Sequence, residues 1–252
     1  MEKITGIIPT GNEELNIAEA IKSLDFTNEI MIVDSFSKDK TVEIATPLVD
    51  TIFKREFKYP ADQKNWAIPQ AKHKWILLLD ADERVTNDLK REIIKVINSN
   101  TKKSGFWIRR ENYFMGKKVR FSGWQGDKVI RLFKRDECRY ENKLVHEEII
   151  SEGEIGILKH KLTHNTFKNK DLYLEKLARY AKWQAKDYHK KTGKITIFHT
   201  MLKPAFRFIK HYFIQLGILD GYIGLIISIY QAKAVSMRYN YLQKYRNENR
   251  TR

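Results

Sequence analysis

The stretch WILLLDADERV, residues 75–85, decides the fold prediction. Five apolar residues, Trp75 to Leu79, run directly into the acidic group Asp80-Ala81-Asp82-Glu83. An apolar run of this length that ends abruptly in polar residues is typical of a buried strand that emerges at the edge of a sheet. Crowded carboxylates repel one another, so we expect a positive group among these acids.

The first hundred residues around this stretch alternate between short apolar runs and helix-like segments. The predicted strands are residues 4–8, 29–33, 51–53 and 75–79, and the predicted helices are residues 16–24, 40–46, 62–71 and 87–98. This alternation predicts an α/β fold with a mostly parallel sheet and helices on both faces. Polar residues follow three of the strands, at the carboxyl ends where such sheets bind ligands.

The pattern changes twice in the remainder of the chain. Residues 105–109 and 128–133 are predicted strands in an irregular region, and beyond Asp171 the chain is predicted to be helical almost to its end. We therefore expect one domain over residues 1–170, with halves of about 1–100 and 101–170, and a helical region over residues 171–252.

Composition limits the class of protein and its partners. The 252 residues are 42% hydrophobic, which is enough for a packed core, and the net charge of +16 favours anionic partners such as nucleic acid, phosphorylated small molecules or an acidic membrane surface. The only cysteine is Cys138, which excludes an internal disulfide. Residues 1–10 lack the features of a signal peptide, so we expect a cytoplasmic protein.

The C-terminal region is basic and aromatic. Residues 200–252 carry nine Lys or Arg against two acids, and Asp220 is the only charged residue between Lys210 and Lys233. Gln215, Asp220 and three glycines argue against a stable transmembrane helix. We predict a helical hairpin that lies in the interface of an anionic membrane. The alternative is that these helices pack on the first domain or on a second copy of the chain.

Asp80 and Asp82 are candidate metal ligands. Residues two apart in an extended segment point the same way, so both carboxylates can bind one cation. Hard oxygen ligands suit Mg²⁺ or Mn²⁺, which such sites hold together with substrate phosphates. A sugar nucleotide and a nucleoside triphosphate fit these two acids equally well. Glu83 and Arg84 have another interpretation, in which they begin the next helix and pair with each other.

A family resemblance becomes specific at this point. The segments IIPTGNEELNIAEAIKSL, EIMIVDSFSKDKTVEIA and QKNWAIPQAKHKWILLLDADERV occur in the order and spacing of family 2 glycosyltransferases with the GT-A fold. The chain most resembles the bacterial branch that adds sugars to the inner core of lipopolysaccharide. The similarity continues through ENYFMGKKVRFSGW, KVIRLFKR, LVHEEIISEGEIGILKHKLTHNT and GILDGYIGL, and so covers most of the chain.

The resemblance implies a UDP-sugar donor and a set of donor-site residues. The residues that match the nucleotide-binding positions are Pro9, Thr10, Asn12, Glu13, Asp34, Lys64 and Asp80. Asp80 and Asp82 match the metal and diphosphate motif, and His164 matches a late histidine that reaches the metal in some related enzymes. Gly11 departs from the family, which usually has a larger residue there, so we expect stacking on the base to be weaker or to be supplied by another residue.

The resemblance also implies inversion at the anomeric carbon, which requires a base for the acceptor hydroxyl. The candidate base is Glu147, with His146 as its neighbour or alternative. Trp124 is a candidate for stacking on the acceptor sugar, and Arg131 for binding acceptor phosphates. The acceptor that the resemblance implies is a glycolipid or the lipopolysaccharide inner core, with glucose as the favoured hexose, at the inner face of the cytoplasmic membrane.

Two other functions compete with this prediction. A nucleotidyltransferase on a similar sheet needs a glycine-rich basic loop after the first strand, whereas this chain has the acidic sequence Gly11-Asn12-Glu13-Glu14. A nucleic-acid-binding protein would gather base-stacking aromatics among basic residues. Here the aromatic residues of the C-terminal region stand among long aliphatic runs, which favours lipid. We therefore expect no nucleic-acid partner.

Overall fold

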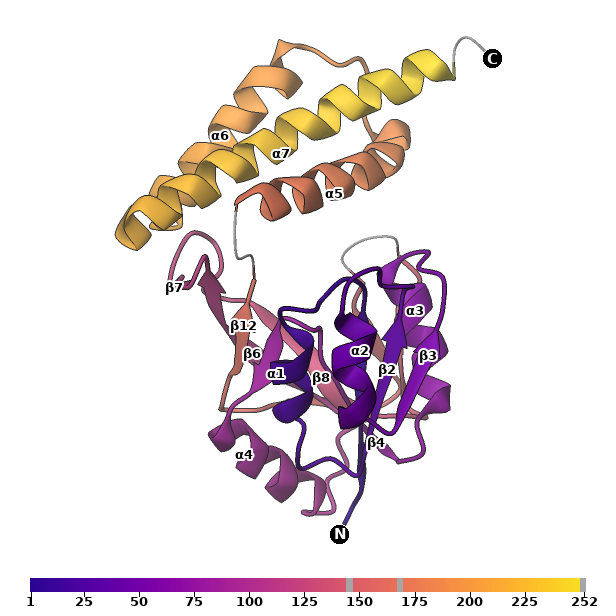
Figure 1. Cartoon of the computed structure of the whole chain (residues 1–252). Helices are drawn as coiled ribbons and strands as arrows, with labels where there is room; N and C mark the ends of the chain where they lie inside the picture. Colours follow the sequence, from indigo (N-terminus) through magenta and orange to yellow (C-terminus); the bar gives the residue numbers. More distant parts are fainter. Residues whose placement is uncertain (144–146, 167–169, 250–252) are drawn as a thin grey trace. The chain divides into compact units, whose positions relative to one another are not determined.

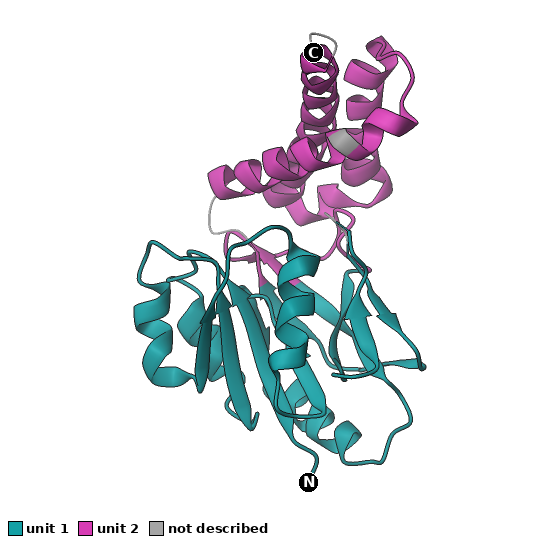
Figure 2. Ribbon diagram, turned by 90° about the vertical axis from the view of Figure 1, so that its right-hand side faces the viewer, with its two compact units in different colours: residues 1–111, 127–164 teal, residues 112–126, 165–252 magenta. Residues whose placement is uncertain are grey.

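A computed structural model describes residues 1–143, 147–166 and 170–249 (Figure 1). The chain forms two compact units (Figure 2). The first unit contains Met1–Glu111 and Asp127–His164, and the second contains Asn112–Gly126 and Asn165–Arg252. Residues 112–126, which the sequence analysis assigned to the sheet domain, therefore group with the C-terminal helices.

The first unit holds most of the strands. Its helical elements are α1 (Ile17–Lys22), α2 (Thr41–Ala45), η1 (Thr46–Leu48), α3 (Pro60–Ala67), η2 (Ile68–Gln70) and α4 (Asn87–Ile97). Its strands, two of which continue into the second unit, are β1 (Ile4–Thr10), β2 (Glu29–Asp34), β3 (Thr51–Lys54), β4 (Trp75–Leu78), β5 (Glu83–Val85), β6 (Gly105–Phe114), β8 (Lys128–Lys134), β9 (Cys138–Tyr140), β10 (Ile149–Ser151), β11 (Ile155–Ile157) and β12 (Leu162–Asn165).

The main sheet has the order β3-β2-β1-β4-β8-β6-β12-β5. The strands β3, β2, β1 and β4 are all parallel, as the alternation of strands and helices predicted. The next strands reverse direction, since β8 is antiparallel to β4 and β6 is antiparallel to β8. Because β1, β2, β3 and β4 are parallel, their carboxyl ends lie at the same edge of the sheet. The polar loops after β1, β2 and β4 begin at this edge.

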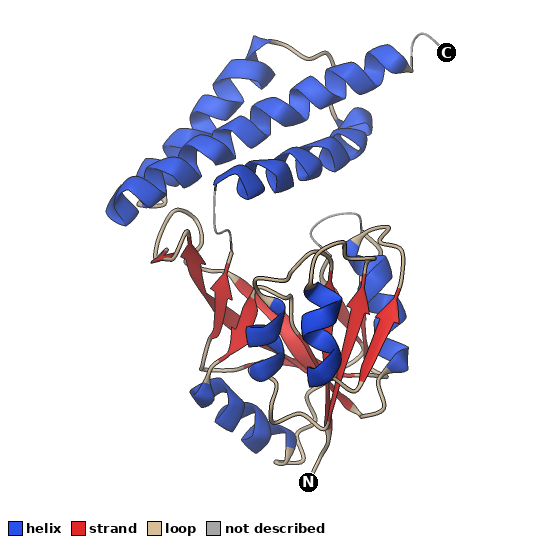
Figure 3. Ribbon diagram, in the orientation of Figure 1, coloured by secondary structure: helices blue, strands red, loops and turns tan. Residues whose placement is uncertain are grey.

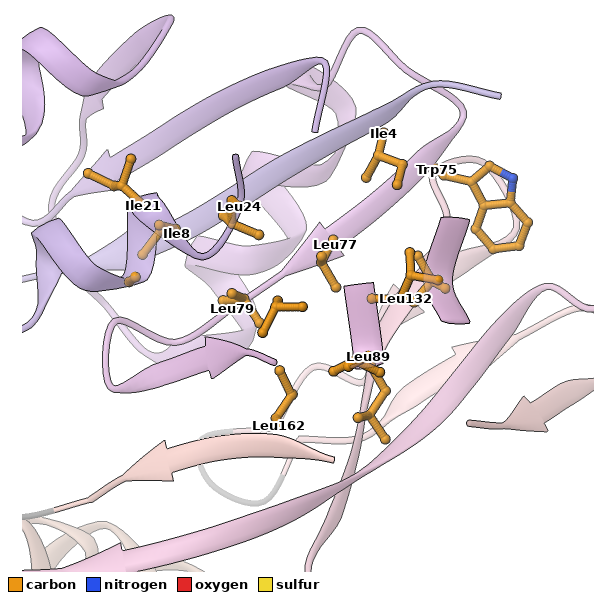
Figure 4. Close-up of a cluster of buried hydrophobic side chains, with 14 of the residues drawn as sticks. Ile4, Ile8, Ile21, Leu24, Trp75, Leu77, Leu79, Leu89, Leu132 and Leu162 are labelled. Atoms are coloured by element: carbon orange, nitrogen blue, oxygen red, sulfur yellow. The ribbon is translucent and has the colours of Figure 1, made fainter. Parts of the chain in front are cut away.

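The core covers both faces of the parallel strands because side chains of a strand alternate in direction. On one face Ile8, Ile32 and Leu77 belong to a buried cluster with residues of α1 and α4, part of which is drawn in Figure 4. On the other face Ile7 and Leu78 belong to a second cluster, which includes residues of α3. The predicted α/β sheet with helices on both faces is confirmed.

Two local features differ from the sequence interpretation. Glu83 and Arg84 do not begin a helix: they lie in β5, which pairs with β12, and α4 begins only at Asn87. The helix predicted over residues 62–71 begins at Pro60 and ends as an α-helix at Ala67, followed by the 3₁₀ turn η2 that contains Pro69. Proline lacks the backbone donor that would continue the α-helix.

The second unit is helical apart from strand segments such as β7 (Figure 3). Its elements are β7 (Lys117–Lys118), α5 (Lys170–Lys191), η3 (Phe198–Leu202), α6 (Lys203–Ile209), η4 (Lys210–Ile214), η5 (Gly217–Asp220) and α7 (Gly221–Glu248). Phe114 and Val119 pack with Tyr173 of α5 and Ile227 of α7, so the 112–126 segment shares a core with the helices. Among the described residues, the stretch Gly217–Glu248 is long and apolar enough to cross a membrane, by length and composition alone.

Candidate active site

The carboxyl ends of three parallel strands supply most of the predicted donor-site residues. Thr10, at the end of β1, pairs in register with Asp34, at the end of β2. Pro9 pairs with Val33 one step earlier, and Ile7 pairs with Leu78 of β4, two residues before Asp80. Residues that are far apart in the sequence thus reach the same edge of the sheet.

The loops after β1 and β2 are hydrogen-bonded to each other. The backbone N–H of Asn12 donates to Ser37 Oγ over 2.8 Å, and the Asn12 side chain accepts the N–H of Lys38, also over 2.8 Å. Asn12 has a φ of 57°, a left-handed conformation that asparagine tolerates better than most residues. The N–H of Glu13 donates to the hydroxyl of Thr41 over 2.7 Å. These bonds give the two loops a defined conformation above the sheet edge.

Asp34 and Thr10 form the floor below these loops. The Asp34 carboxylate is fully buried and accepts the backbone N–H of Ser37 over 3.0 Å. The Thr10 hydroxyl is also buried, and within the described part of the chain it has no hydrogen-bond partner. A buried hydroxyl without a partner is costly, so a ligand that bonds to Thr10 would relieve that cost.

Asp80 lies among three cations. Its carboxylate contacts the guanidinium of Arg131, and it lies 3.6 Å from Arg110 Nη2 and 3.8 Å from Lys64 Nζ. The sequence analysis expected a positive group among the acids, and these side chains supply it. An incoming metal or diphosphate would therefore meet a carboxylate whose charge is already balanced.

Glu83 contacts two of these cations, Arg110 and Arg131. Its carboxylate is fully buried, 2.6 Å from Arg110 Nη2 and 2.8 Å from Arg131 Nε, and it accepts the backbone N–H of Asp80 over 3.0 Å. Burial alone would lower the pKa of Arg131, but Asp80 and Glu83 raise it well above its ordinary value. Arg131 is therefore a permanent cation whose position depends on two carboxylates.

Lys64 connects Asp80 with the candidate base. Its ammonium lies 2.8 Å from Glu147 Oε1 and 4.8 Å from the centre of the Tyr140 ring. The side chains of Lys64 and Glu147 are only 9% and 11% exposed. Burial would lower the pKa of Lys64, but Asp80, Tyr140 and Glu147 raise it above its ordinary value, so the ammonium stays charged. The other candidate base, His146, lies outside the described residues.

Asp82 lies beside His164, with 3.5 Å between Asp82 Oδ2 and His164 Nε2. The β5–β12 pairing explains this proximity, since His164 lies opposite Glu83 in that ladder. No group of three or more His, Cys, Asp or Glu arranged to hold a metal occurs among the described residues. Two carboxylates and an imidazole nevertheless suit Mg²⁺ or Mn²⁺ when substrate phosphates complete the coordination.

The part of the chain that forms this sheet edge matches a known protein family. A family model described as glycosyl transferase family 2 matches residues 5–151, more than half of the chain. The chain belongs to glycosyl transferase family 2. Membership in this family selects the glycosyltransferase over the nucleotidyltransferase and the nucleic-acid-binding protein that the sequence analysis also considered.

Two relatives of the glycosyltransferase have similar sequences. An uncharacterised glycosyltransferase of Rickettsia typhi is 28% identical over 250 residues, which cover 94% of this chain and 86% of the relative. The lipopolysaccharide core biosynthesis glycosyltransferase LpsC of Rhizobium meliloti is 30% identical over 151 residues, which cover 58% of this chain and 56% of LpsC. The resemblance to lipopolysaccharide core enzymes is confirmed.

Two solved structures have the same general fold as the glycosyltransferase. The mannosyltransferase PcManGT of Pyrobaculum calidifontis, solved with GDP-Man and Mn²⁺, gives a TM-score of 0.52 at 16% identity and covers 98% of this chain and 87% of its own. S. aureus TarS, solved with UDP-GlcNAc, gives 0.50 at 16% identity and covers 98% and 92%. These similarities confirm the GT-A-like fold.

The structure of the glycosyltransferase adds two residues that sequence reasoning missed, Glu83 and Arg110. Arg131, which the sequence predicts as a contact of acceptor phosphates, is only 2% exposed, and its guanidinium contacts Asp80 and Glu83. Its acceptor role stays a prediction. A charged residue inside an apolar strand was the signal available for Arg131. Arg110 stands between Arg109 and Glu111, so its sequence context gives no such signal. Trp124 lies in the second unit, and its acceptor role stays a prediction.

Proposed function

We propose that the protein is an inverting hexosyltransferase that moves a hexose, with glucose favoured, from a UDP-sugar to the inner core of lipopolysaccharide or a related glycolipid. The observation that carries the proposal is the chain of contacts Asp80–Lys64–Glu147, which joins the predicted diphosphate motif to the predicted base through a largely buried ion pair of Lys64 and Glu147. The similarity to LpsC supports the acceptor class.

The donor would bind at the sheet edge between the loops after β1, β2 and β4. Asp34 offers a carboxylate that can accept the uracil N–H, and the Thr10 hydroxyl offers a buried group without a partner among the described residues. TarS, with the same general fold, was solved with UDP and with UDP-GlcNAc. Lys64, Arg110 and Arg131 would supply positive charge near the diphosphate.

We assign a divalent metal, Mg²⁺ or Mn²⁺, to Asp80 and Asp82, with His164 beside them. When bound, the metal neutralises charge on the leaving diphosphate. The similarly folded mannosyltransferase PcManGT was solved with Mn²⁺. Carboxylate oxygens and an imidazole nitrogen are donor types that suit this kind of ion, and Asp82 Oδ2 and His164 Nε2 lie 3.5 Å apart.

Glu147 is proposed as the general base. In a single displacement the acceptor oxygen forms its bond to the anomeric carbon while the bond to the UDP oxygen breaks. The UDP oxygen takes the electron pair, and the configuration of the sugar inverts. Glu147 accepts the proton of the acceptor hydroxyl, a task that typically contributes about 10²–10⁴-fold in rate.

The proposed location is the inner face of the cytoplasmic membrane, where a glycolipid acceptor is within reach. The net charge of +16 and the basic C-terminal region support attraction to an anionic surface. In this proposal the first unit carries the donor site, and the second unit brings the enzyme to the membrane.

The first test is UDP binding measured by calorimetry with Mn²⁺ and with EDTA. We expect UDP to bind only when the metal is present. Asp82→Ala should weaken this binding by about a hundredfold or more, because loss of a direct metal ligand should exceed the roughly 10–100-fold loss seen for residues that only support the ligands. Asp25→Ala, which removes an exposed carboxylate of the same unit, is the matched control. Metal-independent binding that Asp82→Ala leaves unchanged would remove the metal role.

The second test identifies donor and acceptor. Purified enzyme is incubated with UDP-glucose, UDP-galactose or UDP-GlcNAc and with core oligosaccharide that lacks its outer sugars, and the product is analysed by mass spectrometry and NMR. We expect transfer from UDP-glucose with inverted anomeric configuration. Transfer with retention, or only from a non-uridine donor, contradicts the proposal.

A further inference from the structure

The helix formed by η3, α6 and η4, residues 198–214, has an apolar outer face. We call it the outer helix. Seven of its large apolar side chains are between 46% and 64% exposed: Phe198, Met201, Leu202, Phe206, Ile209, Phe213 and Ile214. Most of these positions follow helical spacing along one side, so they form a stripe rather than scattered contacts. A contiguous apolar surface of this kind marks an interaction site.

The inner face of the same helix carries polar groups. Lys203 Nζ donates to the hydroxyl of Tyr239 over 2.9 Å, and Arg207 Nη2 donates to the side chain of Gln231 over 3.3 Å. His211 is buried, and its Nδ1 donates to the backbone carbonyl of Ser122 over 2.8 Å. A helix on a water-facing surface normally turns its polar side chains outward. The outer helix has the reverse arrangement.

The apolar surface continues into the turn that follows. Leu219 and Tyr222 are 63% and 64% exposed, while the carboxylate of Asp220 between them turns inward. Asp220 accepts the backbone N–H groups of Arg120 and Phe121 and the hydroxyl of Ser122. The single acid of this region is therefore held away from the apolar surface.

Beyond its first residues α7 does not provide this surface, although its length and composition would allow it to span a membrane. Much of α7 cannot contact lipid, because several of its large side chains are buried in the core of the second unit. These side chains are Ile223, Ile227, Val235, Tyr239 and Leu242. α7 contacts both α5 and α6. Extracting α7 into a bilayer would expose the cores of the helical unit.

Charge decides which partner fits the outer helix. Residues 188–219 contain no Asp or Glu and six Lys or Arg, and Lys191 and Lys194 at the start of the region are exposed. A second copy of this chain would bring the same positive charges against each other, whereas an anionic lipid surface complements them. Lys203 and Arg207 face the core of the helical unit, so the exposed charge of this region comes mainly from the lysines before the outer helix, such as Lys191 and Lys194. Exposed phenylalanines on one side of a helix, with lysines nearby, are typical of segments that lie in a membrane interface.

We propose that the outer helix and the turn after it, residues 198–222, lie in the plane of an anionic membrane with their apolar face in the boundary between headgroups and acyl chains. This inference deepens the proposed membrane location. It does not depend on the transfer reaction, because lipid binding requires neither donor nor acceptor.

The test is vesicle flotation of the full-length protein. The probes are vesicles of phosphatidylethanolamine with phosphatidylglycerol, and vesicles of phosphatidylcholine alone. We expect the protein to float with the anionic vesicles, less so at high salt, and to bind the neutral ones weakly. The variant Phe206→Gln/Ile209→Gln/Phe213→Gln should bind anionic vesicles about tenfold more weakly or worse, since each replacement removes an apolar side chain from the interface.

The matched control is Leu48→Gln/Phe57→Gln/Ile157→Gln, which replaces three exposed apolar side chains of the first unit. We expect it to float like the unmodified protein, and thermal unfolding should show that both variants are folded. Equal flotation of the outer-helix variant and the control overturns the proposal. So does a stable dimer in light scattering that the outer-helix variant dissociates without affecting flotation, since the surface then belongs to a second copy.

Discussion

Lys64 lies between two carboxylates that have different predicted tasks. Its ammonium is 2.8 Å from Glu147 Oε1 and 3.8 Å from Asp80 Oδ1, in a cluster where Lys64 and Glu147 are largely buried. Removing one partner of a buried ion pair leaves the other charge uncompensated. Lys64 is therefore placed to hold Glu147 in position, beyond any contact it makes with the donor.

A double-mutant cycle tests this coupling. At saturating UDP-sugar, Glu147→Gln should slow transfer by about 10²–10⁴-fold, and Lys64→Met by roughly a hundredfold, because the base is no longer held. The double variant should be little slower than Glu147→Gln, since both changes disable the same step. UDP affinity measured by calorimetry separates this loss from weaker donor binding.

Lys22→Met is the control for that cycle, because Lys22 forms an ion pair with Glu19 in the same unit and both side chains are exposed. It should leave transfer unchanged. If Lys64→Met reduces only UDP affinity and its rate recovers at high donor concentration, Lys64 is a donor contact and does not position the base.

Asp220, the last residue of η5, directs its side chain away from the helix that follows it. Asp220 stands at the N-cap position of α7, yet its side chain does not cap that helix. Its carboxylate instead accepts the N–H of Arg120 over 2.9 Å, the N–H of Phe121 over 3.0 Å and the hydroxyl of Ser122 over 2.7 Å. One side chain thus fixes the loop that carries Trp124, the predicted acceptor contact.

We expect Asp220→Ala to reduce the free energy of unfolding of the second unit by roughly 2 kcal/mol, because hydrogen bonds to a charged group are worth about 1.5–3 kcal/mol and leave unpaired donors when removed. Chemical denaturation followed by circular dichroism measures this change. Asp88→Ala, which removes an exposed carboxylate paired with Arg91, should cost less than about 1 kcal/mol. If the two changes lower the free energy of unfolding equally, the three hydrogen bonds of Asp220 stabilise the protein no more than an exposed ion pair does.

The long elements could be predicted from sequence, because their apolar periodicity is strong. The strand predicted at residues 29–33 is β2, Glu29–Asp34, and the helix predicted at residues 87–98 is α4, Asn87–Ile97. β5 could not be predicted in the same way. It has three residues, two of them charged, and it exists through its pairing with β12 and the ion pairs of Glu83, contacts that no local pattern reveals.

The predicted site residues show the same division. Those at strand ends, such as Thr10 and Asp34, follow from the topology of a parallel sheet, and the structure brings them to one edge. The buried partners Glu83 and Arg110 depend on how β5, β6 and β8 lie together, which requires the fold. The roles proposed for all these residues are predictions for the experiments above.

At the scale of the whole molecule, the helical region also packs against a segment from the middle of the chain, apart from the membrane binding proposed for it. Residues 112–126 lie in the same compact unit as residues 165–252. The contacts of Asp220 join residues 98 to 100 positions apart in the sequence, and Gln215 accepts the N–H of Ser122 through its backbone carbonyl over 3.0 Å. A division of the chain at residue 170, drawn from sequence alone, separates segments that fold together.

Deletion of residues 200–252 should therefore do more than release the enzyme from membranes. The segment 112–126 loses Asp220, His211 and α7 as packing partners. Lys117, Lys118 and Arg120 are already exposed, and the loosened backbone around them should fit a trypsin active site more readily. Limited proteolysis with mass spectrometry should detect cleavage after these residues at least about tenfold faster in the truncated protein than in the full chain. The outer-helix variant Phe206→Gln/Ile209→Gln/Phe213→Gln keeps the inner contacts and should stay protected while losing vesicle binding. If the truncated protein resists trypsin as well as the full chain does, residues 200–252 serve membrane binding alone, and their support of the 112–126 segment is refuted.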